Sequence, residues 1–146
     1  MTRIVIDTSV VLKWYLADEE NGQKALAILD KYVSNELDIL APSLLEYEVI
    51  NGLIIAKKRG RIQEKKILTA IEGFISLEIK LISLSLYYPK VIHYSKIYNR
   101  SAYDASYLAL ADDEDISLVT ADKGLYAVVK KDLKWVEWLG ELKLSE

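Results

Sequence analysis

Apolar and polar positions follow two different periods along the chain. Short apolar runs rich in β-branched residues predict strands at residues 3–6, 38–40, 80–84, 116–119 and 135–138. The segments between them carry apolar residues at the 3.6-residue period of amphipathic helices. These stripes are Ala25, Leu26, Leu29, Tyr32 and Val33, then Leu45, Val49, Leu53 and Ala56, and later Tyr87, Val91, Tyr94 and Tyr98. Alternating strands and helices predict an α/β fold with a mainly parallel sheet.

Length and composition favour one compact domain over residues 1–146, because no Pro-, Gly- or Ser-rich linker interrupts the 146 residues. The absence of cysteine excludes disulfides and thiolate metal sites, and a single histidine excludes a multi-histidine site. No run approaches the roughly 20 apolar residues that span a bilayer, so we expect a soluble, cytoplasmic protein without membrane contact. A net charge of -3 provides no overall basic field for nucleic acid.

Two acidic residues directly follow predicted strands. Asp7 comes after the run RIVI, and Asp122 follows ISLVT through Thr120 and Ala121. Ligands of open α/β sheets bind at the carboxyl ends of strands, so both residues are candidates for a site. Each is equally explained as a helix N-cap, because aspartate is favoured there.

Two further acids lie in segments predicted to be helical. Ser43 and Glu46 match a capping box, which leaves Glu48, at the margin of the buried stripe, as the better site candidate. Ser101 and Asp104 match the same box, so Asp104 also has a structural alternative. The acidic tract 112–115 is interpreted as a solvated loop without chemistry.

Basic residues concentrate at 57–66, where they are best explained as cations that complement a helix C-terminus and remain solvated. A contact with phosphates is the less favoured alternative. Lys13, Arg100 and Lys123 lie nearer in sequence to the four acids and are the better candidates for phosphate contacts.

Taken together, VIDTSV, PSLLEYEVINGL, AYDASYLALA and LVTADKGL, in this order and spacing, resemble the PIN-domain nucleases, and among them the VapC-type toxins of toxin–antitoxin pairs. The resemblance implies a three-layer α/β/α fold and a metal-dependent ribonuclease. It implies that Asp7, Glu48, Asp104 and Asp122 converge to hold Mg²⁺ or Mn²⁺, with the hydroxyls of Thr8, Ser9 and Thr120 beside the metal or the scissile phosphate. RNA, a small VapB-type antitoxin and a second copy of the chain are the expected partners.

The chemistry of the four acids agrees with this reading. Crowded carboxylates repel one another and take up protons unless a cation is present. Mg²⁺ usually takes only one or two carboxylates directly and keeps several waters. We therefore expect Asp7 and Asp104 closest to the first ion, with Asp122 and Glu48 holding waters or a second ion.

Two alternative functions remain open. One is a PIN-like module that binds RNA or protein without catalysis. The other is phosphotransfer through an aspartyl phosphate on Asp7. The phosphotransfer alternative is weaker, because dehalogenase-like enzymes carry a second aspartate two residues later, where this chain has Ser9. A minority interpretation places the tyrosine stripe at 87–98 on a dimer surface.

Overall fold

The computed structural model describes residues 1–144. Within them, five strands form one sheet in which every neighbouring pair is parallel. The strand order is β3-β2-β1-β4-β5. These strands are β1 (Thr2–Ile6), β2 (Leu37–Pro42), β3 (Lys80–Ile82), β4 (Ser117–Thr120) and β5 (Val136–Trp138). The predicted parallel sheet is confirmed, and no strand bound differs from the prediction by more than two residues.

The sheet order places a switch point beside the central strand. The chain runs outward from β1 to β2 and β3, then crosses to β4 on the other side of β1 and continues to β5. Val5 pairs with Leu40 of β2 and with Leu118 of β4. The carboxyl ends of β1 and β4 thus flank the position where open α/β sheets bind ligands.

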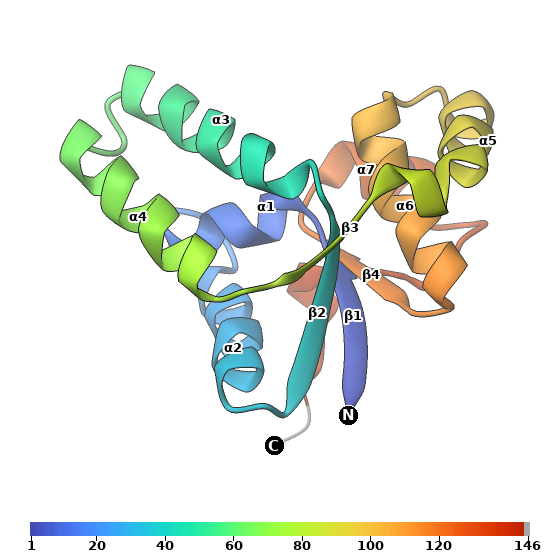
Figure 1. Cartoon of the computed structure of the whole chain (residues 1–146), viewed down its shortest axis with the longest axis horizontal. Coiled ribbons are helices and arrows are strands. Elements are labelled where there is room, and N and C mark those ends of the chain that lie inside the picture. Colours follow the sequence, from blue (N-terminus) through green and yellow to red (C-terminus); the bar gives the residue numbers. More distant parts are fainter. Residues whose placement is uncertain (145–146) are drawn as a thin grey trace.

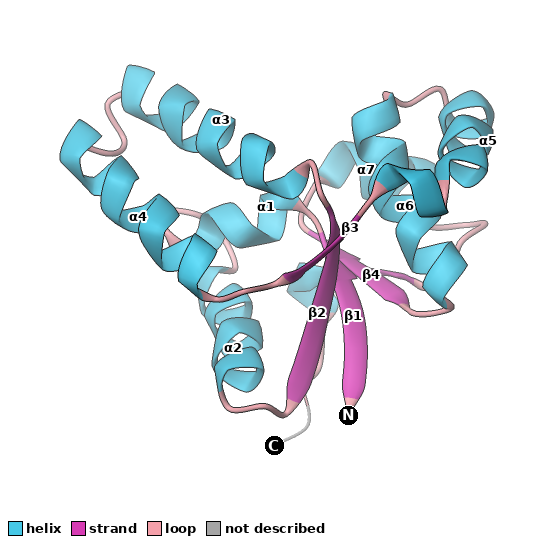
Figure 2. Ribbon diagram, viewed as in Figure 1, coloured by secondary structure: helices cyan, strands magenta, loops and turns pink. Residues whose placement is uncertain are grey.

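Helices cover both faces of the sheet and give a three-layer α/β/α arrangement, as predicted. Figure 1 shows α2 on one side of β1 and β2, and α5 and α6 on the other, while Figure 2 separates strands from helices by colour. The α-helices are α1 (Thr8–Val11), α2 (Gly22–Val33), α3 (Leu45–Lys58), α4 (Glu64–Ser76), α5 (Tyr88–Tyr98), α6 (Ala102–Glu114) and α7 (Lys123–Val129). Short 3-10 turns are η1 (Leu12–Trp14), η2 (Leu84–Leu86) and η3 (Leu139–Glu141).

Helix α6 is the central helix of the core. Its residues from Ala105 to Ala111 are all buried, so it is enclosed on every side rather than amphipathic. It packs against β1, β2 and β4, and α5 packs on its outer side. The amino end of α6, which carries Asp104, is therefore held firmly next to the sheet.

Most predicted stripes are core, with one correction in α2. The stripe in α3 is fully buried, as are Tyr87, Val91 and Tyr94 in and beside α5. Because Tyr87 and Tyr94 lie inside the chain's own core, the alternative that placed the stripe on a dimer surface is wrong for these two residues, whereas Tyr98 is only partly buried. In α2, Leu26 and Val33 are exposed, because the buried face is rotated toward Ala25 and Ile28.

The acidic tract 112–115 is not a loop, contrary to the prediction. Its first three residues form the last turn of α6, and Asp115 ends the helix in the left-handed conformation with φ 55°. Carboxylates at a helix C-terminus are unfavourable with the helix dipole. Here they accept from Tyr94, at 2.7 Å, and pair with Lys90 and Arg3, which offsets that cost.

No helix in residues 1–144 is both long enough and apolar enough to cross a membrane.

Candidate active site

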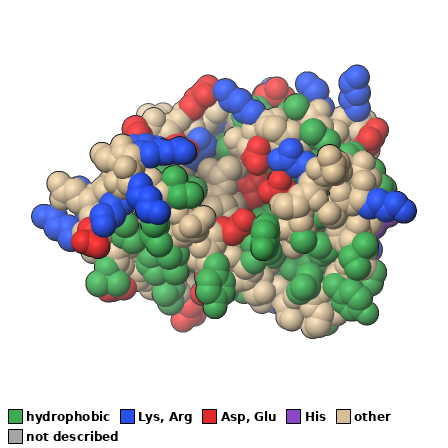
Figure 3. Space-filling model, turned by 90° about the horizontal axis from the view of Figure 1, so that it is seen from above, with side chains coloured by type: hydrophobic (Ala, Val, Ile, Leu, Met, Phe, Trp, Pro, Cys, Tyr) green, Lys and Arg blue, Asp and Glu red, His purple; other side chains and the backbone are tan. Residues whose placement is uncertain are grey.

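The four predicted acids line a single pocket of about 170 Å³ at the carboxyl ends of β1 and β4. Figure 3 shows acidic side chains gathered in a hollow on this face. The complete lining is Asp7, Thr8, Ser9, Glu48, Asp104, Tyr107, Asp122 and Leu125. A larger groove of about 1170 Å³ runs between residues 14–18 and 60–70, and none of the four acids lines it.

Asp7 is the most deeply buried of the four acids, with 5% of its surface exposed. It directly follows β1 and caps α1 by accepting from the Ser9 backbone N–H at 3.1 Å, and both the Ser9 and Thr120 hydroxyls donate to it. Burial raises the pKa of Asp7 to about 6, the Ser9 and Thr120 hydrogen bonds oppose this rise, and the charge of Asp122 adds to it. A cation bound nearby would therefore stabilise the ionised form of this carboxylate.

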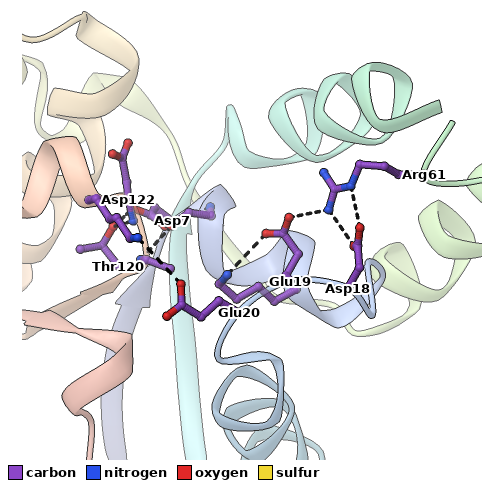
Figure 4. A network of polar contacts seen from close by, with 11 residues as sticks. Asp7, Asp18, Glu19, Glu20, Arg61, Thr120 and Asp122 are labelled. Carbon is purple, nitrogen blue, oxygen red and sulfur yellow. Dashed lines mark hydrogen bonds and ion pairs between the residues drawn. The ribbon is translucent and has the colours of Figure 1, made fainter. Parts of the chain in front are cut away.

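Two hydroxyls join the strand ends that carry Asp7 and Asp122. The Thr120 hydroxyl, which donates to Asp7, also accepts from the Asp122 N–H at 3.0 Å. The Ser9 hydroxyl accepts from the Ala121 N–H at 2.9 Å. Figure 4 shows Asp7, Thr120 and Asp122 close together. These hydroxyls contact the acids directly and position them relative to each other.

Glu48 projects from the first turn of α3 and is held by two hydroxyls. Thr8 donates to Glu48 Oε1 at 2.8 Å, and Tyr107 donates to the same oxygen at 2.6 Å. Glu46, on the same helix, lines a different depression beside α4 and β3. The choice of Glu48 over Glu46 thus agrees with the geometry. The predicted capping box does not form, because α3 starts at Leu45 with Leu44 as an N-cap that makes no side-chain bond.

Tyr107 is a site residue that the sequence interpretation missed. The residue is buried in the core with 3% of its surface exposed, yet it lines the pocket, and its hydroxyl donates to Glu48. Burial, together with the negative charge of Glu48, raises the Tyr107 pKa far above its ordinary value, so the phenol remains a proton donor. The available signal was its spacing of three residues from Asp104, which puts both on one helix face.

Asp104 and Asp122 form the more open side of the pocket. Asp104 lies in the first turn of α6, whose N-cap Ser101 accepts from the Asp104 N–H at 3.1 Å. Asp122 caps α7 by accepting from the Leu125 N–H at 3.1 Å. Arg100 lies against both, with its Nη2 at 2.9 Å from Asp104 Oδ2 and 3.9 Å from Asp122 Oδ2.

None of the three predicted phosphate contacts is among the lining residues, and Lys13 and Lys123, unlike Arg100, pair with acids outside the pocket. Lys13 is 9% exposed and pairs with Glu19 at 3.4 Å, and Lys123 pairs with Glu20 at 3.8 Å. Figure 4 shows Asp18, Glu19 and Glu20 between the pocket and Arg61, which lies at the α3–α4 turn.

The basic residues at 57–66 lie at this turn, away from the pocket. Lys57 and Lys58 are in the last turn of α3, and Arg61 binds Asp18 with both forks of its guanidinium, at 2.8 and 2.9 Å. These contacts agree with a structural role.

The donor set is compatible with a hard divalent cation. Carboxylate and hydroxyl oxygens are the ligands Mg²⁺ prefers, and that ion commonly takes few protein ligands directly. Within residues 1–144, however, no three acidic or histidine side chains are grouped closely enough to surround a metal ion. Four acids around one pocket therefore fit Mg²⁺ through one or two direct contacts, with the rest acting through water.

Comparison with protein families agrees with this architecture. The PIN domain model matches residues 4–131, so the chain belongs to the PIN-domain family, and the predicted family is confirmed. No curated protein sequence matches the chain.

Several solved structures share the fold. PAE2754 from Pyrobaculum aerophilum has 22% identity and a TM-score of 0.66, covering 95% of this chain and 85% of its own. VapC20 of Mycobacterium tuberculosis, described as a sarcin-ricin loop cleaving toxin, has 15% identity and a TM-score of 0.59, covering 85% and 93%. FitAcB from Neisseria gonorrhoeae has 16% identity and a TM-score of 0.59, covering 95% and 99%.

Proposed function

We propose that this PIN-domain protein is a metal-dependent endoribonuclease that hydrolyses RNA phosphodiester bonds, and that it is the toxin of a VapBC-type pair. The observation that carries the proposal is the convergence of Asp7, Glu48, Asp104 and Asp122 on one pocket. They come from four separate segments of the chain, and a fold has little physical reason to gather four carboxylates unless a cation offsets their repulsion.

Each acid has a distinct place in the proposed site. Asp7 and Asp104 would be closest to the first Mg²⁺ or Mn²⁺ ion, and Asp122 and Glu48 would hold its waters or a second ion. When bound, the ion would polarise the phosphodiester and make a water nucleophilic. Tyr107 and Thr8 fix the direction of the Glu48 carboxylate, and Thr120 and Ser9 fix that of Asp7.

RNA would meet the site from its open side. Asp104 and Asp122 are about one third exposed, whereas Asp7 is buried beneath them. We propose Arg100 as the nearest phosphate contact. Lys13 and Lys123 would contact RNA phosphates once their ion pairs with Glu19 and Glu20 are broken. Three cations that exchange internal carboxylates for phosphates would make RNA binding sensitive to salt.

The proposed partners are a small VapB-type antitoxin and a second copy of the chain. The toxin assignment is supported by the fold shared with VapC20, which is described as a sarcin-ricin loop cleaving toxin. The exposed apolar side chains of Leu84, Leu86, Tyr88 and Ile92, on η2 and α5, offer a surface for association.

An aspartyl-phosphate mechanism is disfavoured by the surroundings of Asp7. A nucleophilic carboxylate needs an accessible oxygen, whereas Asp7 is 5% exposed and its two oxygens accept from Ser9 and Thr120.

The decisive experiment compares two glutamates of one helix. Structured RNA is incubated with the wild-type chain in Mg²⁺ or Mn²⁺, with EDTA, and with the Asp7→Asn, Glu48→Gln and Glu46→Gln variants. We expect EDTA, Asp7→Asn and Glu48→Gln to reduce cleavage by at least about a hundredfold, as losses of metal-site residues commonly do. Glu46→Gln should cleave like wild type. Cleavage that survives EDTA or Asp7→Asn would contradict the mechanism, and RNA binding without cleavage would favour a non-catalytic module.

A further inference from the structure

Arg100 makes a pair of contacts that the proposed reaction does not require. Its Nε and Nη2 lie 3.1 and 2.9 Å from Asp104 Oδ2, and Nη2 lies 3.9 Å from Asp122 Oδ2. One guanidinium therefore spans two of the four acids. By contrast, Asp7 and Glu48 accept their side-chain hydrogen bonds from neutral hydroxyls.

The backbone of Arg100 is fixed from both sides. Asn99 ends α5 in the left-handed conformation with φ 51°, and Ser101 is the N-cap of α6. The Arg100 N–H donates to Ser95 O at 3.2 Å, and the Ser95 hydroxyl donates to Arg100 O at 2.6 Å. With the main chain held, only rotation of the side chain can move the guanidinium toward or away from the acids.

The surroundings leave room for that rotation. The guanidinium side chain is 25% exposed. Gly124, in the first turn of α7, faces it without a side chain, and a Cβ built there would lie 3.8 Å from Arg100 Nη1 and 3.4 Å from Asp122 Oδ1. Position 124 therefore contributes no side chain to the space between α7 and the Arg100–Asp122 pair.

The charge of Arg100 lies where the proposed function needs a cation. Asp104 was assigned to the first ion and Asp122 to its waters or to a second ion, and these are the two acids that Arg100 contacts. A guanidinium and a divalent ion on the same carboxylate repel each other at close range. The guanidinium and the divalent ion therefore cannot both bind the Asp104 carboxylate closely at the same time.

We propose that Arg100 is a built-in counter-ion of the candidate active site, which competes with the divalent cation for Asp104 and Asp122. The inference rests on the proposed metal-dependent function. Arg100 keeps the two exposed acids neutralised, and metal binding requires its guanidinium to leave Asp104. The affinity for the ion is consequently set below the value that the four carboxylates alone would provide.

The test measures Mn²⁺ binding to the full chain by electron paramagnetic resonance of the free ion, without RNA. Arg100→Gln removes the competing charge and should lower the dissociation constant for Mn²⁺ about tenfold, a scale typical of one close charge in a partly solvated site. Arg100→Lys retains a charge and should bind Mn²⁺ more weakly than Arg100→Gln. Arg3→Gln is the matched control, because Arg3 pairs with Glu114 at 3.1 Å away from the pocket, and it should leave binding unchanged.

The outcomes separate this inference from the proposed function. Equal or weaker Mn²⁺ binding by Arg100→Gln, with binding by the wild type intact, would overturn the counter-ion role and leave the nuclease proposal standing. If neither the wild type nor Arg100→Gln binds Mn²⁺ at millimolar concentration, both fall. Circular dichroism of each variant verifies folding, and Arg100→Lys provides the comparison if Arg100→Gln is unstable.

Discussion

At the scale of single residues, structural and chemical explanations for the acids turn out to be compatible. Asp7 and Asp122 are N-caps of short helices, as one interpretation of the sequence predicted, and both also line the pocket. Each cap uses one carboxylate oxygen, while the second oxygen of Asp7 accepts from Thr120 and that of Asp122 lies 3.9 Å from Arg100 Nη2. The capping box predicted at Ser101 and Asp104 forms only in part. Ser101 accepts from the Asp104 N–H, but the Asp104 carboxylate accepts from Arg100.

Asp7 has a pH dependence that can be predicted from its burial. The folded protein raises its pKa from 3.8 to about 6, so folding binds a proton in this window, and stability falls as pH rises from about 4 to about 6. Asp7→Asn removes the buried charge. Two pKa units correspond to roughly 3 kcal/mol, and a lost hydrogen bond offsets about 1 kcal/mol, so we expect a net gain of roughly 1–2 kcal/mol at pH 7.

Urea unfolding in the presence of EDTA, from pH 4 to pH 8, checks this expectation. The advantage of Asp7→Asn should disappear near pH 4. The control is Asp30→Asn, on the exposed surface of α2. A variant that is less stable than wild type at pH 7 would show that the hydrogen bonds of Asp7 outweigh its desolvation.

Tyr107 can be tested with the removal of a single oxygen. Tyr107→Phe retains the buried ring and deletes the donor to Glu48, which leaves Thr8 as the remaining donor to Oε1. We expect the unfolding free energy to fall by about 1 kcal/mol and RNA cleavage to fall about tenfold, the equivalent of 1.4 kcal/mol in the barrier. Tyr103→Phe, on the exposed side of the same helix, should change neither. Unchanged cleavage in Tyr107→Phe would mean that the Tyr107 hydrogen bond is not needed to orient Glu48.

At the scale of elements, the junction of β1 with β4 depends on Thr120. This buried hydroxyl donates to Asp7 and accepts from the Asp122 N–H. Thr120→Val keeps the shape but leaves both partners unsatisfied, which should cost about 1–3 kcal/mol. The Asp7 pKa should rise further, because the Thr120 hydrogen bond lowers it. The acid limb of the cleavage profile would then move to higher pH.

Unfolding curves and a pH–rate profile measure the two effects, and Thr120→Ser should restore most of both. Identical profiles for Thr120→Val and the wild type would show that Asp7 titrates independently of this bond.

The elements themselves were largely predictable, and the errors have local causes. The α3 stripe was correct because Leu45, Val49, Leu53 and Ala56 repeat at one helical period and are all buried. The α2 stripe was misplaced because apolar residues occupy both faces of that helix. The acidic tract was interpreted as a loop because it lies between a predicted helix and a predicted strand, and its partners Lys90 and Arg3 lie far away in sequence.

At the scale of the whole molecule, the site exists because of the strand order. Asp7 and Asp122 are 115 positions apart in the printed sequence, yet β1 and β4 pair directly, with Ile6 opposite Val119. Glu48 and Asp104 reach the same pocket because α3 starts at the end of β2 and α6 packs across β1, β2 and β4. No local pattern encodes which strands become neighbours.

The sequence by itself determined the alternation of strands and helices, the position of the acids at or near helix starts, and the place of Glu48 at the margin of the buried stripe. These follow from periodicity and capping, which act over a few residues. Only the tertiary structure decided that β1 lies beside β4, that Tyr107 and Thr8 hold Glu48, and that Arg100 spans Asp104 and Asp122. Such contacts join side chains far apart in sequence, and they depend on how the packed layers bring the helix and strand ends together.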